Sequence, residues 1–328
     1  MSSKKQKKNK KNQNKQTAAP KCDLKFTVKK EKGSFKWNPL RKRVEEEFFE
    51  LLDTHEFTLR KLIFSGEIIK LHEAIKPYIE FAEKEPYFIP IYREIGYNFF
   101  VAEDFQSALY FLEQGLAIAT QLIPPSFSGI IRDKGLFNDA YFATGQMTAE
   151  IFLFLKDYQK ALHVIIQTYF LREFVDDKLI ALYITILIHN GLLFDALKEI
   201  TQFTDNDFSP ELKYLYAWLL FKIGNKTGAQ EQLNIAVAKA PLIAKALLVE
   251  NPGEDEAVEE NDDENGTVDL INQITSEEFP FREKGEFSRF FVKQLRHIEA
   301  KMFARIHYPF WVEVELQEAL RKALKLDV

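Results

Sequence analysis

The sequence predicts an all-α protein built from stacked helix-turn-helix units. The segment VAEDFQSAL at residues 101–109 is echoed by FLKDYQKAL at residues 154–162, so one local pattern is used more than once. Hydrophobic residues make up 46% of the 328 positions and charged residues 28%, while only 13 are glycine. This composition is typical of a helical protein and not of a turn-rich all-β fold.

A small residue marks each unit of the predicted repeat. Successive markers are separated by 34, 53, 35 and 33 residues, and they are Ala74, Ala108, Ala161, Ala196 and Ala229. A period near 34 residues is typical of helix-turn-helix repeats, in which a small side chain lets the second helix pack closely on the first. An aromatic residue three positions earlier, Phe105 or Tyr158, is expected to seal the turn.

At these residues the chain resembles the tetratricopeptide repeat (TPR) family, and in particular uncharacterised bacterial TPR proteins. The family's first-helix pair of a large and a small residue falls on Ile95-Gly96, Thr148-Ala149 and Tyr216-Ala217, and its closing proline on Pro86 and Pro241. The resemblance covers roughly residues 70–250 and implies an α-solenoid. The Ala196 unit departs from the pattern, because Tyr183-Ile184 stands where the small residue belongs, and its two helices are expected to sit further apart.

The step of 53 residues between Ala108 and Ala161 indicates an insertion. It contains LIPPSFSGIIRDKG, whose prolines, glycines and serines do not continue a helix. We therefore expect a loop after Thr120 and a longer leading helix before Thr148.

Four segments are predicted along the chain. They are a disordered basic tail at 1–37, the repeat superhelix at 38–250, an acidic linker at 251–272, and helices at 273–328 that cap the open end of the stack. The first helix is expected to begin after Asn38-Pro39, since Asn is a good N-cap and Pro suits the first helical position.

Charge is divided unevenly between the tail and the body. Residues 1–43 hold 16 Lys and Arg against two acids, a balance of +14. Because the whole chain has a net charge of −5, the remaining residues carry −19. Lysines bind polyanions by releasing counterions, and weak contact with RNA or the ribosome is predicted for Lys4, Lys5, Lys7, Lys8, Lys10, Lys11 and Lys15. The alternative is a solvated tail, or one that folds against the acidic linker.

Signals for catalysis, cofactors and membranes are weak in this sequence. No apolar run approaches the ~18 residues of a membrane span, and no signal peptide follows the lysine run, so the protein is expected to be cytoplasmic and to bind no membrane. Cys22 is the single cysteine, and the six histidines show no metal-ligand spacing. A calcium-loop pattern from Asn261 to Asn272 lacks the bidentate Glu at its end. We expect no enzyme, no metal and no cofactor.

The resemblance implies a concave groove lined by the first helix of each unit. Carried over residue by residue, its lining consists of Arg93, Tyr97, Phe100, Gln146, Glu150, Leu153, Lys178, Ala181, Thr185, Ile188, Tyr214, Trp218 and Phe221. Its aromatics are typical of interface anchors, so the prediction is a non-catalytic adaptor that binds a protein or peptide there. Two alternatives stay open: the C-terminal helices or the insertion fill the groove, or the protein is a nucleic-acid or ribosome-associated protein tethered by its tail.

Overall fold

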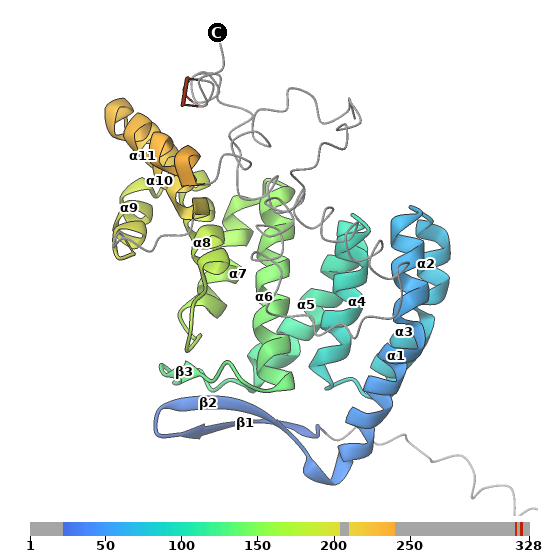
Figure 1. Ribbon diagram of the computed structural model, residues 1–328. Helices are drawn as coiled ribbons and strands as arrows, with labels where there is room; N and C mark the ends of the chain where they lie inside the picture. The colour runs from blue at the N-terminus through green and yellow to red at the C-terminus, as the bar shows by residue number, and fades with distance from the viewer. Residues whose placement is uncertain (1–21, 204–209, 240–318, 320–321, 324–328) are drawn as a thin grey trace, which may run out of the picture.

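Helix pairs stacked side by side form the body of the protein, and a small β-sheet lies across one end of them (Figure 1). The computed structural model describes residues 22–203, 210–239, 319 and 322–323. The predicted all-α repeat class is confirmed, since helices make up the body and follow one another as antiparallel pairs.

Four pairs follow the predicted repeat. They are α4 (Ile89–Val101) with α5 (Phe105–Leu122), α6 (Leu136–Phe154) with α7 (Tyr158–Tyr169), α8 (Asp177–His189) with α9 (Leu193–Thr201), and α10 (Pro210–Lys222) with α11 (Lys226–Lys239). Ala108, Ala161, Ala196 and Ala229 are each the fourth residue of the second helix and are buried. The marker alanines therefore occupy one equivalent place in all four pairs.

The turns within these pairs share one construction. The first helix of each pair is followed by a residue in the left-handed region, with φ between 60° and 88°. These residues are Glu103, Lys156, Gly191 and Gly224. Asp104 and Asp157 then cap the second helix, because their side chains accept hydrogen bonds from the backbone N–H of Ser107 and Lys160. The repeated EDF and KDY segments are thus a turn and cap signal.

The N-terminal helices are less regular. Asn38 caps a short 3-10 turn, Pro39–Arg41, that leads into α1 (Lys42–Phe64), as predicted. Two short helices follow, α2 (Ile68–Ala74) and α3 (Lys76–Lys84), separated at Ile75. Ala74 is the last residue of α2 and only half-buried, so it does not occupy the place of the other marker alanines.

Residues 24–37, which were included in the predicted disordered tail, instead form a β-hairpin. Strands β1 (Leu24–Lys29) and β2 (Lys32–Trp37) are antiparallel, and β3 (Ile130–Ile131), from the insertion, pairs parallel with β2. The hairpin is held by its apolar face: Trp37 stacks on Phe137 at 5.4 Å between ring centroids and meets Phe88 edge-on at 5.3 Å. Burying these rings offsets the cost of ordering a lysine-rich segment.

The insertion has the predicted form of a loop and a lengthened helix. α5 ends at Leu122 and α6 begins at Leu136, twelve residues before Thr148. At the other end of the stack, Ala319 and Ala323 pack against the core, and the Gln230 Nε2 donates to the Ala319 carbonyl at 3.4 Å. These are the described residues of the predicted capping segment 273–328, and the capping itself stays a prediction.

Candidate functional site

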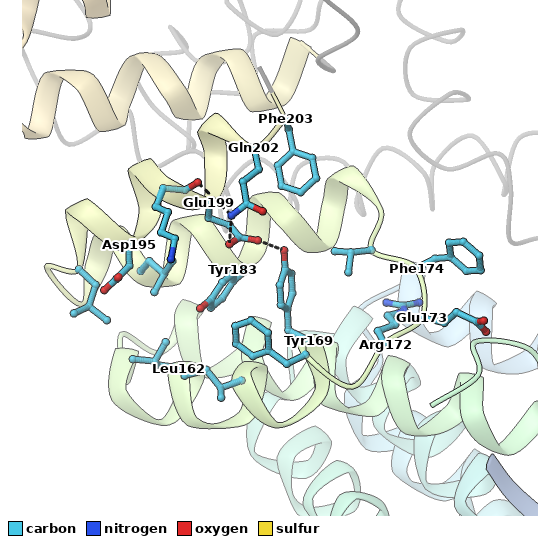
Figure 2. A pocket seen from close by; sticks show the side chains of 16 residues that line it. Leu162, Tyr169, Arg172, Glu173, Phe174, Tyr183, Asp195, Glu199, Gln202 and Phe203 are labelled. Carbon is cyan, nitrogen blue, oxygen red and sulfur yellow. Dashed lines mark hydrogen bonds between the residues drawn. The ribbon is translucent and has the colours of Figure 1, made fainter. Parts of the chain in front are cut away.

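A depression of about 810 Å³ lies between α7, α8 and α9 (Figure 2). Its wall is mostly apolar, and its polar residues come from α9 with the residue that follows it, and from the α7–α8 loop, where they are Arg172 and Glu173. The apolar residues include Leu162, Ile166, Tyr169, Phe170, Phe174, Val175, Tyr183, Leu187, Leu192 and Phe203; the rim holds Asp195, Lys198, Glu199 and Gln202. An apolar hollow with a polar edge is the usual form of a binding site.

The depression lies at the pair that departs from the repeat pattern. The small residue of the first helix is Gly96 in α4 and Ala149 in α6, and a Cβ added at Gly96 would lie 2.4 Å from Leu112 of α5. In α8 the same place holds Ile184, which is fully buried. α8 and α9 approach each other over a shorter length than the other pairs. Ile184 thus stands where the other pairs have a small residue, and Tyr183 beside it lines the hollow.

One wall is the α7–α8 loop, residues 170–176, which presents two exposed aromatic rings. Phe170 is 58% exposed and Phe174 is 71% exposed. The carboxylate of Asp133 accepts the backbone N–H of Phe174 at 2.5 Å and the Nε–H of Arg172 at 3.2 Å. The guanidinium of Arg172 also lies 5.1 Å from the ring centre of Phe142. The insertion that carries Asp133 therefore holds this loop in place.

Across the floor, Tyr169 links α7 to α9. Its hydroxyl donates to the Glu199 Oε1 at 2.6 Å, as Figure 2 shows, and its ring lies 4.4 Å from that of Tyr183. Burial, and next the Glu199 carboxylate, raise the pKa of Tyr169, so its hydroxyl remains protonated and keeps this bond. The depression thus offers aromatic surface and fixed polar groups, which suits binding of an apolar segment.

The predicted groove residues lie on α4, α6, α8 and α10, but most are not open anchors. Trp218 and Tyr214 are 2% and 0% exposed, and Phe100 is buried, which differs from the exposed lining that the sequence suggested. Trp218 meets His189 edge-on at 5.4 Å. Tyr97, Tyr214 and Trp218 are all engaged in further interactions. A partner cannot contact these buried rings unless the residues packed over them move.

The polar members of the predicted groove are half-buried or buried. Arg93 pairs with the neighbouring Glu94. Gln146 donates from its Nε2 to the Glu150 Oε1 at 3.0 Å, one turn along α6. Burial raises the pKa of Glu150 to about 7, and the Gln146 hydrogen bond and the Lys178 charge oppose this only in part. Phe221, also half-buried, has the ammonium of Lys226 5.8 Å from its ring centre.

Several predicted features lie outside the described residues. These are the tail lysines Lys4 to Lys15, the acidic linker 251–272 and the calcium-like segment from Asn261 to Asn272. In the part that the structure does describe, no helix is long and apolar enough to cross a membrane. Within that same part, His, Cys, Asp and Glu side chains nowhere gather in a group of three or more suited to a metal ion.

Sequence reasoning missed the depression itself. Its signals were present, since Ile184 breaks the small-residue pattern and the segment YFLREFVDDK places two phenylalanines between α7 and α8. Neither signal alone identifies a site, because the position of the loop depends on Asp133, thirty-nine residues before Arg172.

Comparisons with known proteins give a distant structural likeness. No protein-family model matches the chain, and no curated protein matches it either. One solved structure that it resembles is the crystal structure of YrrB, described as a TPR protein with an unusual peptide-binding site. The two are 18% identical with a TM-score of 0.42, and the match covers 62% of this chain and 93% of that one. We draw no functional conclusion from a likeness this distant.

Proposed function

We propose that this protein is a non-catalytic adaptor that binds a segment of another protein in the depression between α7, α8 and α9. The observation that carries the proposal is the pair of exposed rings, Phe170 and Phe174, on a loop that Asp133 fixes. Exposed aromatics beside a hollow are typical interface anchors, and a loop that is already ordered costs less entropy on binding.

The chemistry of the lining favours an apolar segment with a basic or amide neighbour. Phe170, Phe174 and Leu192 supply apolar surface, while Asp195 and Glu199 place carboxylates on the rim. Glu199 already accepts from Tyr169, so its position is set before a partner arrives. A helical-repeat scaffold suits this role because its rigid pairs hold a shaped surface without chemistry of their own.

Peptide display on the full-length protein tests the proposal, followed by fluorescence polarisation on the selected peptides. We expect Phe170→Ala with Phe174→Ala to weaken binding at least tenfold, since truncating an interface anchor costs more than about 1.4 kcal/mol. Tyr110→Ala on α5 is the matched control, because Tyr110 is 63% exposed and does not line the depression. Peptides that bind the double variant as tightly as the wild type would place the site elsewhere.

A further inference from the structure

The β-hairpin has one apolar face and one face rich in lysine. Its register pairs Leu24 with Trp37 and Phe26 with Phe35 on the side toward the helices. Side chains alternate along a strand, so the intervening pairs share the opposite face. Those pairs are Lys25 with Lys36, Thr27 with Ser34, and Lys29 with Lys32. We call this surface the lysine face.

Most of the charge on the lysine face is uncompensated. Lys32 forms an ion pair with Glu173, but Lys25, Lys29 and Lys36 are exposed and form no ion pair within the described residues. Like charges directly opposite on two strands are destabilising. The hairpin therefore carries two lysine pairs at a cost to its own stability, which is the arrangement expected of a surface that meets an anionic ligand.

The dimensions of the lysine face suit a chain of phosphates. The two lysine pairs are four residue steps apart along each strand, or about 13 Å at ~3.3 Å per residue. Partners within a pair lie about 5 Å apart across the ribbon. Aromatic rings are missing from these three cross-strand pairs, so contact there is to the backbone of a ligand and not to stacked bases.

We propose that the lysine face binds the phosphodiester backbone of a nucleic acid, without reading its sequence. This inference is independent of the adaptor function proposed above. In the sequence, β1 begins three positions after the lysine-rich residues 1–21, and residues 1–43 together carry a balance of +14. A nucleic acid presents one charge per nucleotide over any length, so it can match a basic stretch of this extent.

The protein's own acidic segment, residues 254–264, is the competing occupant. It follows α11 in the sequence, and α11 lies at the opposite end of the molecule from the hairpin (Figure 1). Fourteen residues separate Lys239, at the end of α11, from Glu254. An external polyanion is not tethered to α11 and can approach the lysine face directly, so the test below compares the two kinds of polyanion.

Fluorescence anisotropy with a labelled 20-nucleotide oligouridine RNA and a 20-base-pair DNA duplex tests the proposal on the full-length chain. The test variant is K25Q/K29Q/K36Q. The control, K61Q/K76Q/K156Q, removes the same charge from exposed sites elsewhere. Each phosphate contact contributes about 0.7 to the slope of log K against log salt for a single strand. We expect the test variant to lower that slope by about 2 and to weaken binding at least tenfold at ~50 mM salt, and the control to change neither.

Three results would overturn the proposal. One is equal slopes for the test and control variants, which would leave the binding to the tail alone. Another is no binding of either nucleic acid by the wild type at ~50 mM salt. The third is equal dependence on the lysine face for polyglutamate or for vesicles of anionic phospholipid, which would identify a different class of partner. Circular dichroism checks that both variants fold, and removing like-charge pairs is not expected to harm the hairpin.

Discussion

Burial of a carboxyl group in α6 makes the stability of this protein depend on pH. Glu150 is 9% exposed, and burial raises its pKa from 4.5 to about 7 in the folded state. The folded protein therefore binds the Glu150 proton more tightly than the unfolded chain does. Ionising the group costs free energy only in the folded state, where water is replaced by Gln146 and the distant charge of Lys178.

The size and the sign of the effect follow from that shift. One unit of pKa corresponds to about 1.36 kcal/mol, so a shift of about 2.5 units gives about 3 kcal/mol. Below pH 4.5 Glu150 is protonated in both the folded and the unfolded state, and ionisation of this group then costs the folded protein no stability. This favourable condition is the advantage of low pH. The advantage is lost as pH rises toward 7, and above that pH both states are ionised. Glu150→Gln keeps the shape of the side chain, so it should stabilise the protein by about 3 kcal/mol at pH 8 relative to its effect at pH 4.5.

Urea unfolding at several pH values between 4.5 and 8 measures this difference directly. Glu83→Gln is the control, because Glu83 is exposed on α3 and its replacement also removes one carboxylate. We expect the Glu150→Gln curve to diverge from the wild type as pH rises, and the Glu83→Gln curve to run parallel to the wild type. Parallel curves for Glu150→Gln would show that its carboxylate is solvated in the folded protein.

Three further predictions use the same unfolding assay. Burial, and next the charge of Lys222, lower the pKa of His189 to about 4. The free energy of unfolding should therefore decrease as pH falls from 6.5 toward 4, and His189→Phe should abolish that decrease. Gly96→Ala should destabilise by about 1–3 kcal/mol, since its Cβ would lie 2.4 Å from Leu112; an unchanged midpoint would mean that Leu112 moves freely. Lys30 and Glu31 have φ of 51° and 63° in the hairpin turn, so Lys30→Asn with Glu31→Gly should stabilise by about 1 kcal/mol or more, and a loss would contradict this.

The repeat could be predicted from the sequence because a small residue recurs at the same position of each unit. Ala108, Ala161, Ala196 and Ala229 occupy the same place in four helix pairs, where the second helix packs against the first. A large side chain at this position would force the two helix backbones apart. A recurring small side chain therefore indicates that the two helices pack closely. Ala74 has the right spacing but ends its helix, which shows that spacing alone does not fix the place of a residue.

The hairpin was missed because its average composition hides its alternation. Leu24, Phe35 and Trp37 are buried, while lysines between them keep the segment polar overall. Their apolar neighbours lie far along the chain, as Phe137 of α6 does. The alternation of apolar and polar residues is visible in the sequence. Without knowledge of the helices that the apolar face packs against, this alternation predicts only a marginally stable hairpin.

Position on a helix also proved insufficient to predict an open groove. The family's groove positions, carried over to α10, give residue numbers on that helix but no information about what packs against them. Trp218 meets His189 of the preceding pair and is buried, whereas Phe174 stays exposed because Asp133 holds the backbone of its loop. Contacts between distant segments therefore decide which aromatic rings a partner can reach. Within α8, the local sign of the depression was Ile184, a large residue where α4 has Gly96 and α6 has Ala149.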